Sequence, residues 1–298
     1  RRGLGRWAGG AVLIVYGLWL VAYAGFSLRS SASRFIYTIY PGAPPWPFVI
    51  AGLVMGLFAV LAPVKALARA SELFRWLLVL ALVPILVLGF LEADVETLTP
   101  VYFSDAVPVL EGALSALGLW LCGVRSALAL GLLSGELRRG RFCLGAALLM
   151  ALLIAVTVGR FGHELTGRLT YPFFALVRNT SVFGVTERIE ALVTTLWVLS
   201  DFVIFTLLLC TASHIFRLIF GFRPEKGDVR ALDMSNGRAV IPLCAALSGT
   251  AALLMPANEY VMRRISQLIV PCTILTILFV ILPLLLLIAK LRTPRGAP

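Results

Sequence analysis

Charged side chains are scarce in this sequence. Only 14% of its 298 residues are Asp, Glu, Lys or Arg, whereas soluble domains carry about 25%. Hydrophobic residues make up 60% of the chain, and the mean hydropathy is +0.95. A surface in contact with water needs more charge than this, so the composition excludes an ordinary soluble globular protein and indicates a surface that faces lipid.

Residues that usually perform catalysis or bind metals are also few. The two histidines, His163 and His214, are not accompanied by a Ser/His/Asp arrangement, a phosphate-binding loop or a cluster of metal ligands. The five cysteines form no CxxC pair, so we interpret them as small apolar side chains. We therefore expect no enzyme, no cofactor and no metal. The basic residues are scattered over separate connections, so we expect no nucleic-acid partner either.

Eight apolar stretches account for most of the chain. A helix needs roughly 20 apolar residues to cross about 30 Å of hydrocarbon, whereas membrane barrels alternate polar and apolar residues in segments of about ten. The stretches are approximately 7–28, 46–64, 73–91, 107–133, 142–158, 189–220, 239–255 and 265–291. They are apolar on all sides and joined by short connections, so we predict an all-α polytopic membrane protein with one transmembrane domain over residues 1–298.

The distribution of Lys and Arg predicts the orientation in the membrane. With the N-terminus in the cytoplasm, the inner connections hold roughly twice as many basic residues as the outer ones. The outer connection after the third stretch would then be acidic, with Glu92, Asp94, Glu96 and Asp105. We therefore expect both termini of this chain on the cytoplasmic side.

Two of the outer connections have distinctive patterns. Residues 29–46 contain Pro41, Pro44 and Pro45, and Pro47 follows directly, which indicates a loop that ends the helices on either side. Residues 160–186 include Phe173, Phe174, Leu176 and Val177, interleaved with Arg178 and Asn179. This pattern is typical of a short helix that lies at the membrane interface.

The fourth stretch contains four glycines, Gly112, Gly118, Gly123 and Gly131. Transporters bind small ligands near the bilayer midplane where a helix is discontinuous, because free backbone groups are available there. The N-terminal end of a half-helix favours a carboxylate. Alternatively, the glycines let neighbouring helices pack closely. The sequence leaves both interpretations open.

Charged residues inside apolar stretches are costly and are therefore candidates for function. Asp201 lies well inside the sixth stretch and Arg125 inside the fourth. The two could form a pair, although an arginine at this position could also extend to the inner surface. Tyr16 and Tyr23 are seven residues apart and share one face of the first stretch. They could line a pocket, or they could simply pack against other helices.

Residues 171–200 resemble a known family. Tyr171-Pro172 is followed by Arg178, then by the segment 187–190 (ERIE), and then by Trp197. This pattern resembles the spore germination receptor B subunits, the GerAB-type permeases of the amino acid–polyamine–organocation superfamily. The order of other features is similar to that family, including a cytoplasmic loop with Arg69, Ser71 and Glu72.

The resemblance implies a fold, a function and partners. The fold would be that of the LeuT-type inverted-repeat transporters, with the eight stretches similar to helices three to ten and the first two helices absent from this chain. The protein would sense a small nutrient, such as an amino acid, in the spore inner membrane. It would act with a larger A subunit and a lipoprotein C subunit. The alternative is an amino acid permease of the same superfamily.

The resemblance also implies a ligand site between three stretches. The carboxylate of an amino acid would meet backbone N–H groups near residues 112–118. The candidate ligand-binding residues are Tyr16, Tyr23, Gly112, Ser115, Gly118, Thr195 and Asp201.

Overall fold

A computed structural model describes residues 6–62, 64–99, 139–180, 186–221, 239–256 and 258–281, with isolated positions between 107 and 116 and between 283 and 288. All regular structure in these residues is helical, which confirms the all-α prediction. Five helices are long and apolar enough to span a membrane: Gly9–Thr38, Ala66–Leu91, Leu144–Arg168, Glu190–Ile219 and Glu259–Ile281. The count of eight spans stays a prediction, because most of the fourth stretch lies outside the described residues.

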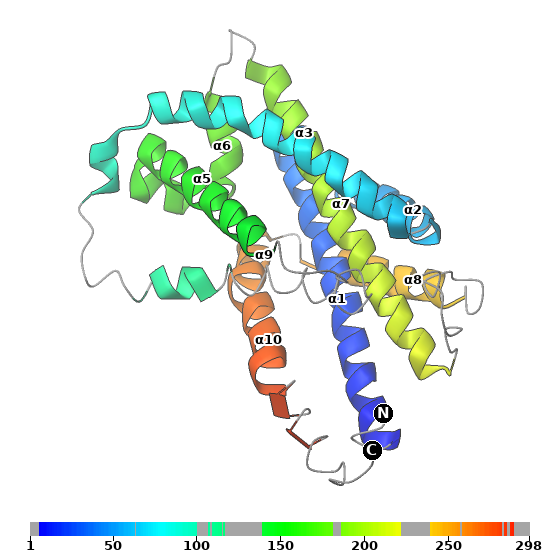
Figure 1. Cartoon of the computed structure of the whole chain (residues 1–298). Coiled ribbons are helices and arrows are strands. Elements are labelled where there is room, and N and C mark those ends of the chain that lie inside the picture. The colour runs from blue at the N-terminus through cyan, green and yellow to red at the C-terminus, as the bar shows by residue number, and fades with distance from the viewer. Residues whose placement is uncertain are drawn as a thin grey trace.

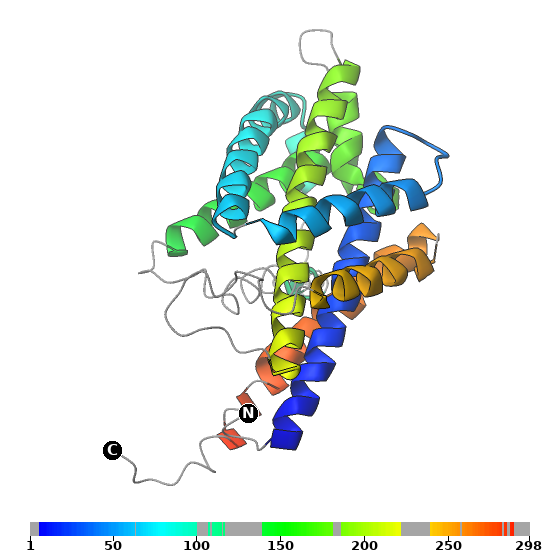
Figure 2. The ribbon, with the colours of Figure 1, turned by 90° about the vertical axis from the view of Figure 1, so that its right-hand side faces the viewer.

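Two long helices form the centre of the molecule. Helix α1 (Arg6–Thr38) and helix α7 (Thr186–Ile219) lie side by side and run in opposite directions (Figure 1). The shorter apolar helices α2 (Trp46–Leu61) and α8 (Val240–Leu254) cross this pair (Figure 2). Residues from all four helices, together with α10 (Val270–Thr276), make up the larger hydrophobic core.

Small residues allow α1 and α8 to approach closely. A Cβ atom added at Gly25 would lie 2.5 Å from the carbonyl oxygen of Ser248 and 2.9 Å from the Cβ of Ala251. Helices in membranes associate largely through such close packing, because lipid supplies no hydrophobic driving force between them. Gly25 is therefore a packing residue of the central helices.

The variant Gly25→Val should destabilise the protein, because the added carbons have no room against the backbone of α8. Overpacking of this kind costs about 1–3 kcal/mol of the free energy of unfolding. Thermal unfolding of the detergent-solubilised protein, followed by size-exclusion chromatography, measures the effect. Gly10→Val on the same helix is the matched control, since a Cβ at Gly10 meets nothing within 4 Å. Equal stability of the two variants would contradict the close α1–α8 crossing.

A second, smaller core lies beside the first. It joins α3 (Val64–Leu91), α5 (Arg139–Arg168) and α6 (Pro172–Asn179) to the first half of α7. Within α5 the backbone bends at Gly162, whose φ of 73° lies in the left-handed region that glycine adopts without strain. Helix α7 therefore contributes to both cores and holds the two halves of the molecule together.

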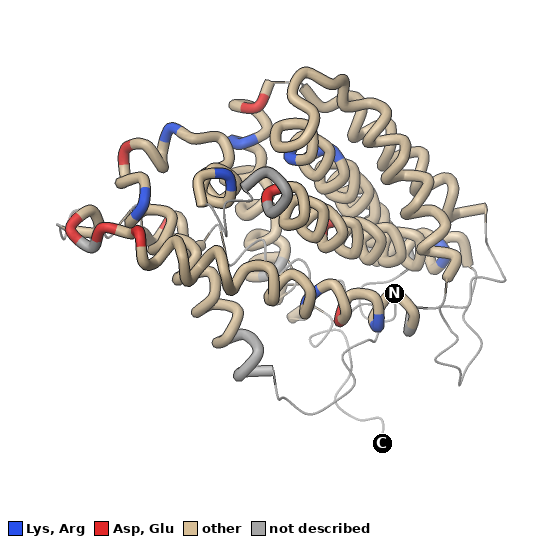
Figure 3. Tube along the Cα trace, turned by 90° about the horizontal axis from the view of Figure 1, so that it is seen from above, with Lys and Arg blue, Asp and Glu red and all other residues tan. Residues whose placement is uncertain are grey.

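The remaining elements lie near the helix ends and in the last apolar stretch. A 3-10 turn, η1 (Val95–Leu98), follows α3. The last stretch is built from α9 (Glu259–Arg264), the π-helical segment η4 (Ile265–Ile269), α10 and a second π-helical segment, η5 (Ile277–Ile281). Long parts of the helices carry no charge, as Figure 3 shows. This pattern is expected of helices that lie in lipid.

Two predicted loops are wrong. Helix α1 continues to Thr38, so the first ten residues of the predicted 29–46 loop are helical. Residues 29–40 contain no proline or glycine, and the buried side chains of Arg29 and Ser31 show that this part packs against other helices. The charged segment around Arg69 and Glu72 is also helical, because α3 begins at Val64. Both segments are polar yet contain no helix-breaking residue, so their polarity alone did not indicate a loop.

The short helix predicted within residues 160–186 is confirmed. Helix α6 begins at Pro172, a residue favoured at the first helical position. Phe174, Leu176 and Val177 are buried, whereas Arg178 is exposed. The first part of the predicted connection, up to Arg168, belongs instead to α5.

A candidate ligand site between three helices

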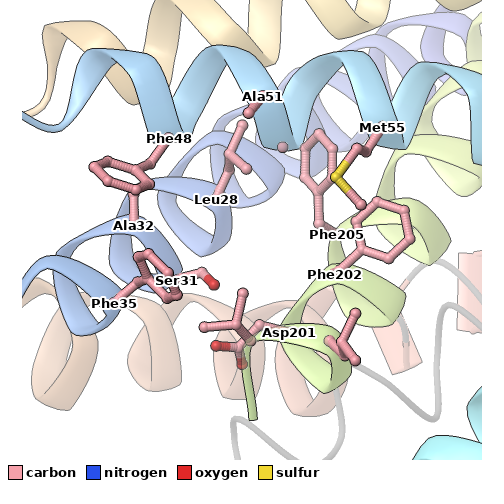
Figure 4. Close-up of a pocket in the computed structure, with 13 residues that line it drawn as sticks. Leu28, Ser31, Ala32, Phe35, Phe48, Ala51, Met55, Asp201, Phe202 and Phe205 are labelled. Carbon is pink, nitrogen blue, oxygen red and sulfur yellow. The ribbon is translucent and has the colours of Figure 1, made fainter. Parts of the chain in front are cut away.

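A cavity of about 170 Å³ lies between α1, α2 and α7 (Figure 4). Helix α1 contributes side chains that are three or four residues apart, so positions 28, 31, 32 and 35 share one helix face. Most of the wall is apolar, and the largest side chains are Leu28, Phe35, Phe48, Met55, Phe202 and Phe205. The polar side chains in the wall are those of Ser31 and Asp201.

Two glycines of α2 make room for the side chains around this cavity. A Cβ atom added at Gly52 would lie 2.7 Å from Cδ1 of Leu28, and one added at Gly56 would overlap the ring of Phe205. Gly52 and Gly56 are four residues apart and so face the same side of α2. The positions of Leu28 and Phe205, and with them the size of the cavity, therefore depend on this Gly-x-x-x-Gly pair.

Asp201 in the cavity wall belongs to an ion pair, whose other member, Arg34, does not line the cavity. Nη2 of Arg34 on α1 donates to Oδ2 of Asp201 on α7 at 2.5 Å. The hydroxyl of Ser31 is a second hydrogen-bond partner of the Asp201 carboxylate. A buried carboxylate is costly unless an opposite charge and hydrogen bonds compensate it, and Arg34 supplies that compensation. Asp201 therefore sits in the cavity wall as half of a pair that joins the two central helices.

Arg34 keeps one hydrogen-bond donor without an acceptor. Its Nε atom is buried and has no hydrogen-bond partner among the residues that the structure describes. Buried donors without acceptors are uncommon in proteins, because each carries an uncompensated desolvation cost. The carboxylate in the cavity wall is thus bonded to an arginine that lies behind the wall and can still donate one hydrogen bond.

Tyr171 lies near the same arginine. Its ring meets the ring of Tyr37 edge-on, with 5.0 Å between the ring centroids. Burial raises the pKa of Tyr171 above its ordinary value of 10.0; the nearby charge of Arg34 opposes this shift, whereas Glu259 and Tyr37 reinforce it. The phenol is therefore uncharged at neutral pH and remains a hydrogen-bond donor.

The motif residues of segment 171–200 are in contact with one another. The ring of Trp197 on α7 lies 5.1 Å from the ring of Phe173 and 5.7 Å from that of Phe174 on α6. Arg178 and Glu190 approach to 4.0 Å between Nε and Oε2. These contacts dock α6 onto α7 and place Tyr171 near Arg34, so the motif has a structural basis.

The structure places the predicted ligand-binding residues in different surroundings. Asp201 lines the cavity, and its partners are Arg34 and Ser31. Tyr16 and Tyr23 do share one face of α1, where both stack on Trp19, with centroids 6.1 and 5.4 Å apart. That face packs against the larger core, and neither tyrosine lines the cavity.

The other predicted residues lie away from the cavity or outside the described residues. Thr195 is exposed, and its hydroxyl donates to the carbonyl oxygen of Ala191. Gly112 is exposed. Ser115, Gly118 and Arg125 are not among the described residues, so the broken helix and its role in binding stay predictions.

Sequence reasoning missed Arg34, Ser31 and the glycine pair of α2. Two signals could have found them. The spacing of Leu28, Ser31 and Phe35 follows one helix face if the helix continues past residue 28. The glycine spacing of four in the second apolar stretch is typical of close helix contacts.

Comparison with known proteins identifies the family. Residues 1–259 match the model of the spore permease family, which is described as "Spore germination protein". The chain is also similar to spore germination protein YndE of Bacillus subtilis (strain 168), with 21% identity over 302 residues, covering 98% of this chain and 78% of YndE. No solved structure matches. Because the family match covers most of the chain, this protein belongs to the spore germination permease family, as its resemblance over residues 171–200 predicts.

Proposed function

We propose that this protein is the nutrient-sensing membrane subunit of a spore germinant receptor, and that the nutrient is an amino acid. Membership of the family supports a role in germination. The observation that carries the ligand assignment is the Arg34–Asp201 pair, whose carboxylate lies in the wall of a largely apolar cavity. Binding alone suffices for sensing, so we assign no catalytic step to the protein.

An α-amino acid matches the charges of this pair. Its ammonium group would bind the Asp201 carboxylate, and its carboxylate would bind Arg34, whose Nε–H has no other described acceptor. When a zwitterion binds in this way, each of the four charges, two on the ligand and two on the protein, lies next to a charge of opposite sign. A ligand with a single charge would leave one member of the pair uncompensated, which is strongly unfavourable in a buried site.

The same pair provides a route from binding to signalling. Arg34 and Asp201 connect α1 to α7, so a ligand between them would change the relation of the two central helices. A ligand that binds one arrangement more tightly shifts the population towards it. We propose that the A subunit and the lipoprotein C subunit respond to this shift in the spore inner membrane, with both termini of this chain in the cytoplasm. The fourth stretch, with Ser115 and Gly118, would supply further backbone contacts to the ligand.

Deletion of the gene tests the role in germination. Spores without the protein should lose their response to one nutrient while they still germinate normally with others. The measurement is the fall in optical density after challenge with single amino acids and sugars, and complementation with the intact gene is the control. An unchanged response to every nutrient would contradict the sensing role.

The alternative, an amino acid permease, predicts a different result. A permease moves its substrate, so uptake of a radiolabelled amino acid into cells or vesicles should depend on the gene. A sensor has to bind the amino acid but does not have to move it across the membrane. Uptake that is lost with the gene, while germination is unaffected, would favour the permease.

A further inference from the structure

The first turns of α3 carry exposed basic side chains in front of an uncharged helix. Arg69 and Arg75 are exposed, whereas residues 76–91 contain no Asp, Glu, Lys or Arg. At about 1.5 Å per residue this uncharged segment is roughly 24 Å long, which is shorter than the hydrocarbon layer of about 30 Å. Arg75 therefore lies near the edge of the hydrocarbon, and the turns before it, with Arg69, lie among the lipid headgroups.

Trp76 lies at the same boundary. Its side chain is 63% exposed, and Cζ of Arg75 lies over its ring, 5.4 Å from the ring centroid. Tryptophan is enriched at membrane–water interfaces, because its amphipathic ring fits the level of the headgroups. One and four residues further along α3, Leu77 and Leu80 are exposed as well, as expected of side chains in contact with lipid tails. Headgroup-facing and tail-facing side chains thus follow one another along this part of α3.

The protein supplies little negative charge to these arginines. Glu72 and Arg75 approach to 3.6 Å between Oε1 and Nη2, but both side chains are exposed, and exposed pairs are weak because water and salt screen them. Arg69 has no acidic partner among the residues that the structure describes. Positive charge therefore exceeds negative charge on the described side chains at this end of α3.

We propose that the start of α3 binds an anionic phospholipid, with Arg69 and Arg75 on its phosphate and Trp76 beside the upper part of its acyl chains. A guanidinium group can donate two parallel hydrogen bonds to phosphate oxygens. A zwitterionic lipid is a poorer ligand, because its own cationic group repels the arginines. An acidic protein segment would match the arginines but not the apolar side chains of Trp76 and Leu80 that follow, whereas a phospholipid matches both.

This lipid binding is separate from the binding of the nutrient. It depends on the position of α3 in the membrane and involves no residue of the cavity between α1, α2 and α7. In the orientation that we propose, the lipid lies in the inner leaflet. Each basic side chain near an anionic membrane surface should increase the preference for an anionic lipid roughly fivefold.

Quenching of Trp76 fluorescence by brominated lipids tests the proposal. The full chain is reconstituted in phosphatidylcholine vesicles that contain increasing fractions of either brominated phosphatidylglycerol or brominated phosphatidylcholine. Bromine quenches an indole only at close contact, and the chain has six tryptophans, so the signal of Trp76 is the difference between the wild-type protein and Trp76→Phe. Half-maximal quenching of Trp76 should require a roughly tenfold or more lower fraction of brominated phosphatidylglycerol than of brominated phosphatidylcholine.

Arginine variants show whether the preference has the proposed cause. Arg69→Gln should reduce it roughly fivefold, and Arg69→Gln/Arg75→Gln should abolish it while both lipids still quench Trp76. Arg168→Gln/Arg264→Gln is the matched control, because it removes two exposed arginines from other helices and should leave the preference unchanged.

Three results would overturn the proposal. Equal quenching of wild-type Trp76 by the two lipids would leave the arginines available to an acidic protein segment instead. Quenching by neither lipid would show that protein covers Trp76. A preference that persists in Arg69→Gln/Arg75→Gln would exclude these arginines as its source. Because both arginines are exposed, their variants should fold, and size-exclusion chromatography before reconstitution checks this.

Discussion

The single variant Arg34→Met should be much less stable than the wild-type protein, because it leaves the buried carboxylate of Asp201 without its partner at 2.5 Å. Breaking a buried ion pair from one side costs about 3–5 kcal/mol. Asp201→Leu should have a similar effect, since it leaves Arg34 unpaired. Fluorescence-detected size-exclusion chromatography of the solubilised protein, after heating to a series of temperatures, measures the loss.

The double variant Arg34→Met/Asp201→Leu separates stability from ligand recognition. Replacing a buried pair by apolar residues of similar volume is often neutral or stabilising, so this variant should be folded. It should nevertheless not respond to the nutrient, because both charges that would bind the zwitterion are gone. A double variant that is folded and still responds would show that the pair does not bind the ligand.

An exposed pair provides the control for these experiments. Arg168 and Glu164 approach to 3.8 Å on α5, but their side chains are 80% and 74% exposed. Exposed pairs contribute about 0–1 kcal/mol because water and salt screen them. Arg168→Met should therefore leave stability nearly unchanged, and a loss as large as that of Arg34→Met would contradict the distinction between the two pairs.

The second large effect is expected from Trp197→Ala. This change removes the ring that packs against Phe173 and Phe174, so α6 would lose its main aromatic contacts with α7. Removing a large aromatic side chain from a core costs about 3–5 kcal/mol of the free energy of unfolding. Because Trp197 is only half-buried, we expect a loss of about 3 kcal/mol.

Limited proteolysis would show where the Trp197→Ala protein opens. Cleavage should increase between α5 and α7, at the ends of α6, before it increases elsewhere. Trp76→Ala is the matched control, because Trp76 is 63% exposed on α3. If both variants resist proteolysis equally, the docking of α6 onto α7 by Trp197 would be contradicted.

The sequence predicted the helices whose signal is local. Runs of apolar residues near span length identified the central helices α1 and α7, and the mixture of apolar and polar residues after Tyr171 predicted α6. The same reasoning ended α1 ten residues early, at Leu28 instead of Thr38. Serine and arginine look like loop residues in sequence, but in this helix Arg29 and Ser31 are buried by its neighbours.

The candidate site was harder to predict, because it depends on how three helices meet. Asp201 was identifiable from a charge in an apolar stretch, a local signal. Its pairing with Arg34, which is 167 residues away in the chain, depends on tertiary packing. The surroundings of Tyr16 and Tyr23 also depend on tertiary packing. Their spacing predicted a shared face, but only the packing of α1 decides what that face contacts.

The central claim is that this protein senses a nutrient in the cavity between α1, α2 and α7, and filling that cavity tests it most directly. Ala32 is buried and lines the cavity, whereas Ala22 is exposed on the same helix. Spores that carry Ala32→Leu or Ala22→Leu at equal protein levels, checked by immunoblot, are challenged with increasing concentrations of the nutrient whose response is lost in the deletion strain. The account predicts that Ala32→Leu raises the concentration for half-maximal germination roughly tenfold or more, while Ala22→Leu and the response to a nutrient-independent trigger are unchanged. Identical nutrient sensitivity of the two variants would contradict binding in this cavity.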